Sequence, residues 1–245
     1  MNPYIAEVLG TFLLILIGNG IVANVVLKNT KADNEGFLFI TIGWGLAVFF
    51  AVMVVAPFSG AHINPAVTIG LALVGKFSWA LVPGYLIAQL AGAFLGGLAV
   101  FIFYKDHYKI TEDTDAIRAT FCTSPAIKNT FSNFFSEMIG TFTLVLAVLF
   151  VVSPSLEING EQQLVGLGSL EALPVGLIVW VIGMGLGGTT GYAINPARDL
   201  GPRIAHAFIN LKHKGANGWS YSWIPVLGPF AGGALAAGFY LMVTI

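Results

Sequence analysis

The chain has 245 residues, of which 56% are hydrophobic and only 9% are charged, and its formal net charge is -1. Soluble domains carry about 25% charged residues, so this composition excludes an ordinary soluble domain and indicates a protein that crosses a membrane several times. The near-neutral charge argues against a nucleic-acid partner, and a single cysteine, Cys122, excludes a disulfide within these residues.

Six stretches are apolar and long enough to cross a bilayer, which requires roughly 20 residues. In chain order they are residues 4–27, 36–56, 78–103, 131–152, 172–188 and 222–245. The first stretch lacks a preceding positively charged segment, so we expect a retained helix and not a cleaved signal. Two further segments, 64–75 and 195–208, are too short to cross and lie between crossings.

These segments belong to an internal repeat. The sequence AEVLGTF around Glu7 recurs as SEMIGTF around Glu137, and SGAHINPA recurs as TGYAINPA in the same order. Because each half has three crossings, the second half must enter the membrane upside down, and such repeats place a shared site near the midplane. We therefore expect a single domain, 1–245, with repeats 1–104 and 131–245 joined by the loop 105–130.

Each short segment begins with the same triplet, which is Asn64, Pro65 and Ala66 in the first and Asn195, Pro196 and Ala197 in the second. Asn is a favoured N-cap and Pro suits the first helical position, so each triplet predicts a helix start. Two such N-termini meeting at the membrane centre, each equivalent to about +0.5 charge, would oppose cations and protons. Capping uses the Asn oxygens, and we expect their NH2 groups to be free for a passing solute.

At these residues the chain resembles the aquaporin and aquaglyceroporin superfamily, whose signature is two Asn-Pro-Ala boxes. The resemblance covers essentially the whole chain and implies an all-α membrane protein with six transmembrane helices and two re-entrant half-helices in an inverted repeat. It also implies a homotetramer with one pore per subunit, in the plasma membrane, with both termini cytoplasmic. The loop charges disagree, because this orientation places Lys76 alone inside and most loop Lys and Arg outside.

Four residues match the spacing of the family's selectivity filter, and we call them the filter residues: Trp44, Gly183, Tyr192 and Arg198. Strict water channels usually carry His at the position of Gly183, so the resemblance implies space for a polyol, with its CH groups on the aromatic rings and its hydroxyls on Arg198. Tyr192 departs from the Phe that is common in the glycerol-conducting branch. Asp199 and a basic residue four positions later, Arg203, are typical of that branch and are expected to pair.

Glu7 and Glu137 lie in apolar helices, where a carboxylate is costly unless it is paired. We expect them to accept hydrogen bonds from backbone N–H groups of the re-entrant loops, the role that the family gives them; the alternative is a proton relay. His62 resembles the family's pore-lining histidine, and a purely structural role is the alternative. No metal-ligand spacing and no nucleophile–base motif occurs, so we expect no metal, no cofactor and no enzymatic activity.

The resemblance predicts passive conduction of glycerol and other small uncharged solutes, together with water, and exclusion of ions and protons. The alternative solute within the channel class is a neutral organic acid such as protonated lactic acid. Two other classes remain open, a proton-coupled secondary transporter and a receptor or adhesion protein without flux. Uptake that is insensitive to the proton gradient would favour the channel.

Overall fold

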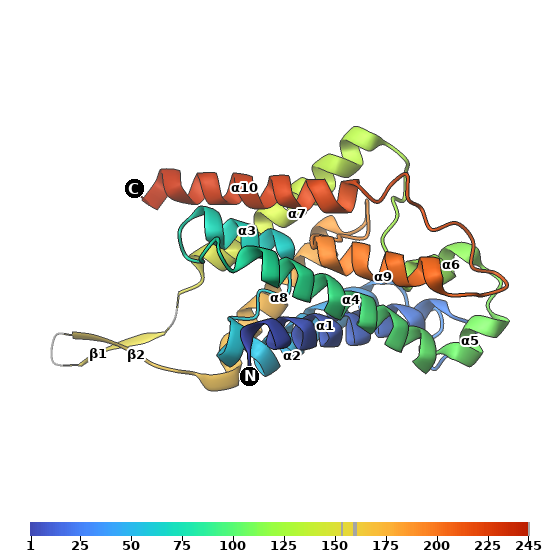
Figure 1. Cartoon of the computed structure of the whole chain (residues 1–245), viewed down its shortest axis with the longest axis horizontal. Helices are drawn as coiled ribbons and strands as arrows, with labels where there is room; N and C mark the ends of the chain where they lie inside the picture. Colours follow the sequence, from blue (N-terminus) through green and yellow to red (C-terminus); the bar gives the residue numbers. More distant parts are fainter. Residues whose placement is uncertain (153, 159–160, 245) are drawn as a thin grey trace.

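The structure, a computed structural model, describes residues 1–152, 154–158 and 161–244. Six helical segments within these residues are long and apolar enough to span a membrane (Figure 1). They comprise α1 (Pro3–Val26), α2 (Phe37–Ser59), α4 (Val82–Phe103), α7 (Thr130–Phe150), α8 (Leu173–Leu186) with the preceding 3-10 turn η1 (Gly168–Ala172), and α10 (Ile224–Thr244). Each falls on an expected crossing, with boundaries shifted by up to about four residues; Ile245 lies outside the described residues.

Two shorter helices, α3 (Pro65–Leu73) and α9 (Pro196–Phe208), occupy the two segments that were expected to be half-helices. Each is capped as the triplets predict: Asn64 Oδ1 accepts from Ala66 N at 2.9 Å, and Asn195 Oδ1 accepts from Ala197 N at 3.0 Å. The half-helix α3 packs chiefly against α10, and α9 packs chiefly against α4. Each half-helix therefore rests on the last helix of the opposite repeat.

The connections contain elements that the sequence analysis did not anticipate. The loop 105–130 holds two short helices, α5 (Lys105–Ile110) and α6 (Thr114–Ala119). Between α7 and α8, β1 (Ser155–Ile158) pairs antiparallel with β2 (Glu161–Leu164), with Ser155 opposite Leu164. In Figure 1 this hairpin projects from the helices on the side that carries both termini. The all-helical fold class holds, with this hairpin as a small addition.

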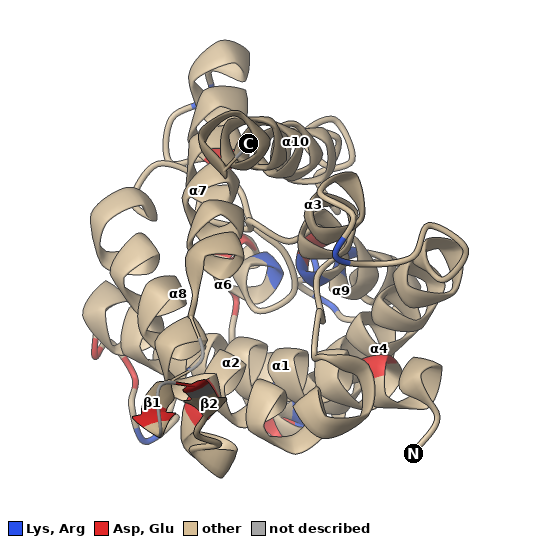
Figure 2. Ribbon diagram, turned by 90° about the vertical axis from the view of Figure 1, so that its left-hand side faces the viewer, with Lys and Arg blue, Asp and Glu red and all other residues tan. Residues whose placement is uncertain are grey.

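Glycines set the closest helix contacts. A Cβ at Gly92 would lie 2.2 Å from the Val8 carbonyl oxygen, so α4 can approach α1 only with glycine there. Gly232 fulfils the same requirement between α10 and α7, where a Cβ would lie 2.1 Å from the Met138 carbonyl oxygen. Gly92 and Gly96 in α4 form a Gly-xxx-Gly pair, as do Gly228 and Gly232 in α10, and both pairs serve packing inside one chain. Viewed from the end with both termini, the helices surround a centre and most of their length carries no charge (Figure 2).

Candidate functional site

The first re-entrant loop is held by Glu7, which is fully buried. Its carboxylate accepts hydrogen bonds from the backbone N–H groups of His62 and Ile63 at 3.0 and 2.7 Å. Ser59 Oγ and Gln89 Nε2 also donate to it, each at 2.7 Å. A carboxylate with four donors is matched to its buried environment. Gln89 was missed by the sequence analysis, although a polar side chain inside an apolar helix is itself a signal.

The second re-entrant loop is held by Glu137 in the same way. This carboxylate is also fully buried, and it accepts from Ala193 N at 3.0 Å and from Ile194 N at 2.8 Å. Both glutamates thus supply acceptors to N–H groups that no helix or strand satisfies. At membrane depth such groups need a partner within the protein.

The two loops share an unusual backbone. Left-handed φ angles recur at equivalent positions, which are Gly60 and Gly191 (78° and 79°), Ala61 and Tyr192 (50° and 37°), and Ile63 and Ile194 (42° and 43°). For non-glycine residues this conformation is costly and persists only where surrounding contacts enforce it. The hydrogen bonds to Glu7 and Glu137 are such contacts. The inverted repeat therefore extends from sequence to individual backbone angles.

The two asparagine caps also join the loops to each other. Asn64 Nδ2 donates to Ile194 O at 2.9 Å, and Asn195 Nδ2 donates to Ile63 O at 2.8 Å. The expectation that these NH2 groups are wholly free is wrong, because each uses one N–H to hold the opposite loop. One N–H of each asparagine remains for a solute.

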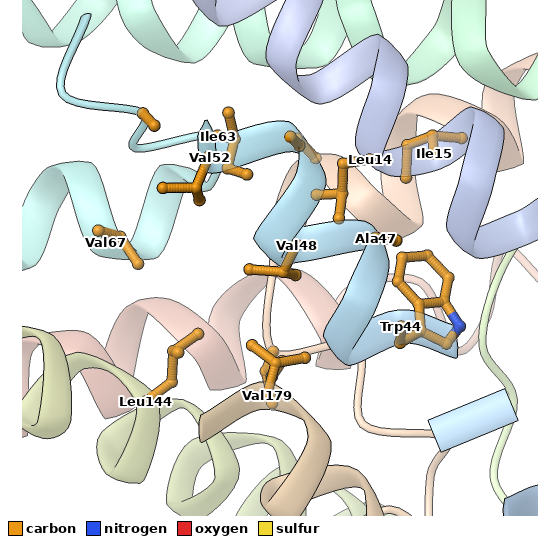
Figure 3. Close-up of a cluster of buried hydrophobic side chains, with 14 of the residues drawn as sticks. Leu14, Ile15, Trp44, Ala47, Val48, Val52, Ile63, Val67, Leu144 and Val179 are labelled. Carbon is orange, nitrogen blue, oxygen red and sulfur yellow. The ribbon is translucent and has the colours of Figure 1, made fainter. Parts of the chain in front are cut away.

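A central cavity of about 130 Å³ lies against these loops. Much of its wall is aliphatic, and the side chains come from α1, α2, α3, α7 and α8 and face one another in Figure 3: Leu14, Val48, Val52, Val67, Leu144 and Val179. Polar and aromatic side chains also line it: His62, Asn64, Asn195, Arg198, Trp44 and Tyr192. The cavity thus offers apolar contact together with a few placed hydrogen-bonding groups, the usual composition of a small-molecule site.

Three of the filter residues meet at this cavity. The Arg198 guanidinium carbon lies 4.2 Å from the ring centroid of Trp44, within range of a cation–π contact. Arg198 is only 6% exposed, and its Nη1 has no hydrogen-bond partner among the described residues. The Tyr192 hydroxyl is also buried without such a partner. The other guanidinium nitrogens are not among these enclosed atoms and have no hydrogen-bond acceptor among the described residues, so Arg198 retains donors next to the cavity.

Gly183, the fourth filter residue, lies directly against Tyr192. It is not among the residues that line the cavity. A Cβ at Gly183 would lie 2.7 Å from Tyr192 Cζ and 2.9 Å from the Tyr192 hydroxyl oxygen. The space that glycine provides is thus already filled by the Tyr192 ring. Glycine at this position makes room for the aromatic side chain of Tyr192.

Asp199 and Arg203 form a buried ion pair within α9, with Arg203 Nε 2.8 Å from Asp199 Oδ1. Asp199 also accepts from the backbone N and the Oγ1 of Thr123, at 2.8 and 2.7 Å. Arg203 Nη2 donates to Thr123 O at 2.9 Å. The pairing of Asp199 with Arg203 agrees with the sequence expectation. Thr123 carried no sequence signal, because it lies in a long loop 76 residues from its partner.

Comparison with known proteins finds chains that are similar to this one in sequence and in fold. The family profile described as Major intrinsic protein matches residues 1–240. The probable glycerol uptake facilitator protein of Thermotoga maritima is 51% identical over 240 residues, which cover 98% of each chain. The glycerol uptake facilitator protein of Streptococcus pneumoniae is 51% identical over 236 residues, 96% of this chain and 97% of that protein. The X-ray structure of the aquaglyceroporin from Plasmodium falciparum is 36% identical with a TM-score of 0.80, and the match covers 97% of this chain and 94% of that chain.

Proposed function

The chain belongs to the major intrinsic protein family, and on that premise we propose that it conducts glycerol passively across a membrane. It is a multi-pass membrane protein and a channel, not an enzyme. Relatives at 51% identity over nearly the whole chain are named for glycerol uptake, which supports glycerol as the solute.

The observation that carries the proposal is the lining of the central cavity, which combines aliphatic side chains with a few hydrogen-bonding groups. Glycerol has CH groups along one side of its carbon chain and can turn its hydroxyls to the other. The aliphatic wall, which includes Val48 and Val52, suits the CH groups, and the N–H groups of Asn64, Asn195 and Arg198 suit the hydroxyl oxygens. A solute that loses its hydration shell finds replacement contacts on both sides.

We propose that Trp44, Tyr192 and Arg198 form the constriction, with Gly183 supporting it from behind. A polyol here places CH groups on the aromatic rings and accepts hydrogen bonds from guanidinium N–H groups of Arg198 other than the enclosed Nη1. The hydroxyl of Tyr192 is buried against Gly183. The face that Tyr192 offers to the solute is therefore that of a phenylalanine, which supports a polyol filter despite the departure from the common residue.

Ions and protons are excluded by fixed positive charge. The N-termini of α3 and α9 meet at Asn64 and Asn195, and each helix end behaves as about +0.5 charge. Arg198 adds a full positive charge one turn into α9. Glu7 and Glu137 serve as acceptors for the loops, and their multiple donors argue against a mobile proton on either residue.

We further propose that the chain is one channel domain and forms a homotetramer in the plasma membrane, with both termini in the cytoplasm. This rests on the family resemblance. The Gly-xxx-Gly faces of α4 and α10 are occupied within the chain, so contacts between subunits must use other faces. The orientation conflicts with the loop charges, and protease access to the hairpin β1–β2 in inside-out and right-side-out vesicles tests it directly.

Stopped-flow light scattering on reconstituted vesicles tests the proposal. Osmotic swelling in glycerol should be fast, independent of a proton gradient and unaccompanied by ion current, and water should also pass. Lactate tested at two pH values examines the alternative solute: the neutral acid is favoured only if its flux exceeds that of glycerol and rises as the pH falls. Absence of any solute flux would contradict the channel.

A further inference from the structure

His62 lies in the first re-entrant loop, lines the central cavity and is 8% exposed. Its imidazole is enclosed on its other sides by two aromatic rings. The ring of Phe77 lies 4.5 Å from it, edge-on, and the ring of Tyr85 lies 5.0 Å from it, measured between centroids. This packing restricts rotation of the imidazole.

The hydrogen bonds of Thr68 determine which ring nitrogen carries the proton. Thr68 Oγ1 donates to the backbone oxygen of Asn64 at 3.1 Å, and a carbonyl can only accept. That contact uses the single hydroxyl proton of Thr68. Gln89 Nε2 donates to the same hydroxyl oxygen at 3.0 Å. With the hydroxyl proton of Thr68 on Asn64 O, we infer that the remaining contact, His62 Nδ1 at 3.1 Å from Thr68 Oγ1, is donated by an Nδ1–H group.

A neutral imidazole protonated on Nδ1 has an unprotonated Nε2, which is a hydrogen-bond acceptor. No described residue makes a hydrogen bond to His62 Nε2, and it is not among the enclosed polar atoms without a partner. Because His62 lines the cavity, we infer that this nitrogen faces it. This end of the cavity offers an acceptor side chain, whereas Asn64, Asn195 and Arg198 offer donors.

Phe77 belongs to the connection between α3 and α4, and its neighbour Lys76 fixes that connection. Lys76 Nζ donates to Leu149 O at 3.2 Å, near the C-terminus of α7, and lies 4.6 Å from the ring centroid of Tyr240. A cation at a helix C-terminus is favoured by the helix dipole. The anchored connection holds the Phe77 ring against His62.

We propose that Thr68 and Phe77 are positioning residues that hold the imidazole of His62 in one tautomer and one orientation, with Nε2 presented as an acceptor for solute hydroxyl groups. A hydroxyl both donates and accepts, so a polyol that receives hydrogen bonds from Asn64 and Asn195 can donate one to His62. The role in transport rests on the proposed glycerol conduction; the tautomer does not.

The tautomer can be measured directly by ¹⁵N NMR on the reconstituted full chain labelled in histidine, at pH 8. The sequence has four histidines, and the signals of His62 are those lost in His62→Gln. We expect one neutral form with the proton on Nδ1. A wild-type His62 protonated on Nε2 would overturn the proposal without bearing on glycerol conduction.

Paired variants then test the positioning roles. Thr68→Val keeps the shape of the side chain but removes the acceptor, so the proton should move to Nε2 and glycerol permeability per folded channel should fall about three- to tenfold, as for one lost hydrogen bond. Thr68→Ser should retain the proton on Nδ1 and the wild-type glycerol permeability. Phe77→Leu should broaden or split the His62 signals, and Phe77→Tyr should preserve them. Identical spectra for the two members of either pair would refute the role of that residue. Wild-type vesicles without glycerol flux would refute the proposed function instead.

Discussion

Asn64 and Asn195 each hold the loop that carries the other, since each side-chain NH2 group donates to the carbonyl oxygen of the residue preceding its counterpart. The same side chains cap α3 and α9 through their oxygens. Two half-helices from opposite ends of the chain are thereby fixed end to end. The first prediction concerns this junction.

Asn195→Asp should raise proton and cation leak. The carboxylate can still cap α9, but it loses the donor to Ile63 O and places a negative charge between the two helix N-termini, which offsets their positive potential. Leak is measured with a pH-sensitive dye in reconstituted vesicles under an imposed potential. Asn129→Asp, at the exposed N-cap of α7, is the matched control and should leave the leak unchanged. Equal leak in the two variants would show that the junction does not contribute to the barrier against ions.

Arg198→Ala should also raise the leak, to a modest extent because the two helix ends remain. Removing the guanidinium takes away the full positive charge nearest Trp44. The same dye assay applies, with Arg118→Ala as control, since Arg118 pairs with Asp115 in the long loop. A leak no greater than that of the wild type would show that Arg198 does not contribute to charge exclusion.

Gly183→His should lower glycerol permeability by more than about tenfold, a barrier change of about 1.4 kcal/mol, with water flux less affected. The physical reason is displacement: a side chain at Gly183 collides with Tyr192 Cζ and must push that ring toward the cavity. Gly185→His is the control, because a Cβ there meets nothing within 4 Å. The assay is osmotic swelling in glycerol beside shrinkage in an impermeant osmolyte.

A second substitution distinguishes displacement of the Tyr192 ring from misfolding of the channel. If the Tyr192 ring mediates the effect, Gly183→His combined with Tyr192→Val should recover part of the glycerol flux. Unchanged glycerol flux in Gly183→His, or no recovery in the double variant, would contradict this account of the constriction.

Glu137→Gln should destabilise the fold rather than abolish transport. Its two oxygens accept from Ala193 N and Ile194 N, and an amide would turn one acceptor into a donor that faces a donor. An unsatisfied buried donor costs about 1–3 kcal/mol, so the thermal midpoint in detergent should fall. Glycerol flux per folded channel should persist and remain independent of a proton gradient. Loss of flux at an unchanged midpoint would favour the proton-relay alternative.

Asp199→Asn should expose Cys122, the only cysteine of the chain. Burial, and next the charge of Asp199, raises the pKa of this thiol to about 12, so at pH 8 the reactive thiolate is scarce and alkylation should be slow. Weakening the contacts of Asp199 with Thr123 should loosen the loop and increase the rate; each unit of pKa decrease gives about tenfold more thiolate. Asp115→Asn removes an exposed carboxylate that pairs with Arg118 and should leave the rate as in the wild type.

Local signals explain what the sequence could predict. The Asn-Pro-Ala triplets combine an N-cap with a favourable first residue, and both do produce helix starts at Pro65 and Pro196. The crossings could be located because each contains a run of apolar residues long enough to span a bilayer. The Asn159-Gly160 dipeptide, which follows the alternating apolar residues Leu156 and Ile158, is a local hairpin signal.

The remaining features depend on contacts between distant residues. Asn64 and Ile194 are 130 positions apart, and no local pattern specifies that an asparagine amide will meet a particular carbonyl. Gly183 shows the same limit. A glycine in the sequence indicates missing volume, but only the fold shows that the Tyr192 ring occupies it.

The crossed arrangement of the half-helices has a consequence for biosynthesis. The half-helix α3 packs against α10, and Asn64 bonds to Ile194. The first repeat therefore leaves the ribosome before these packing partners have been synthesised. The structure around the pore can be completed only after the last helix has been inserted. A chain truncated before α10 should therefore leave the Asn64 loop accessible to added proteases, and supplying α7–α10 as a separate polypeptide should protect it.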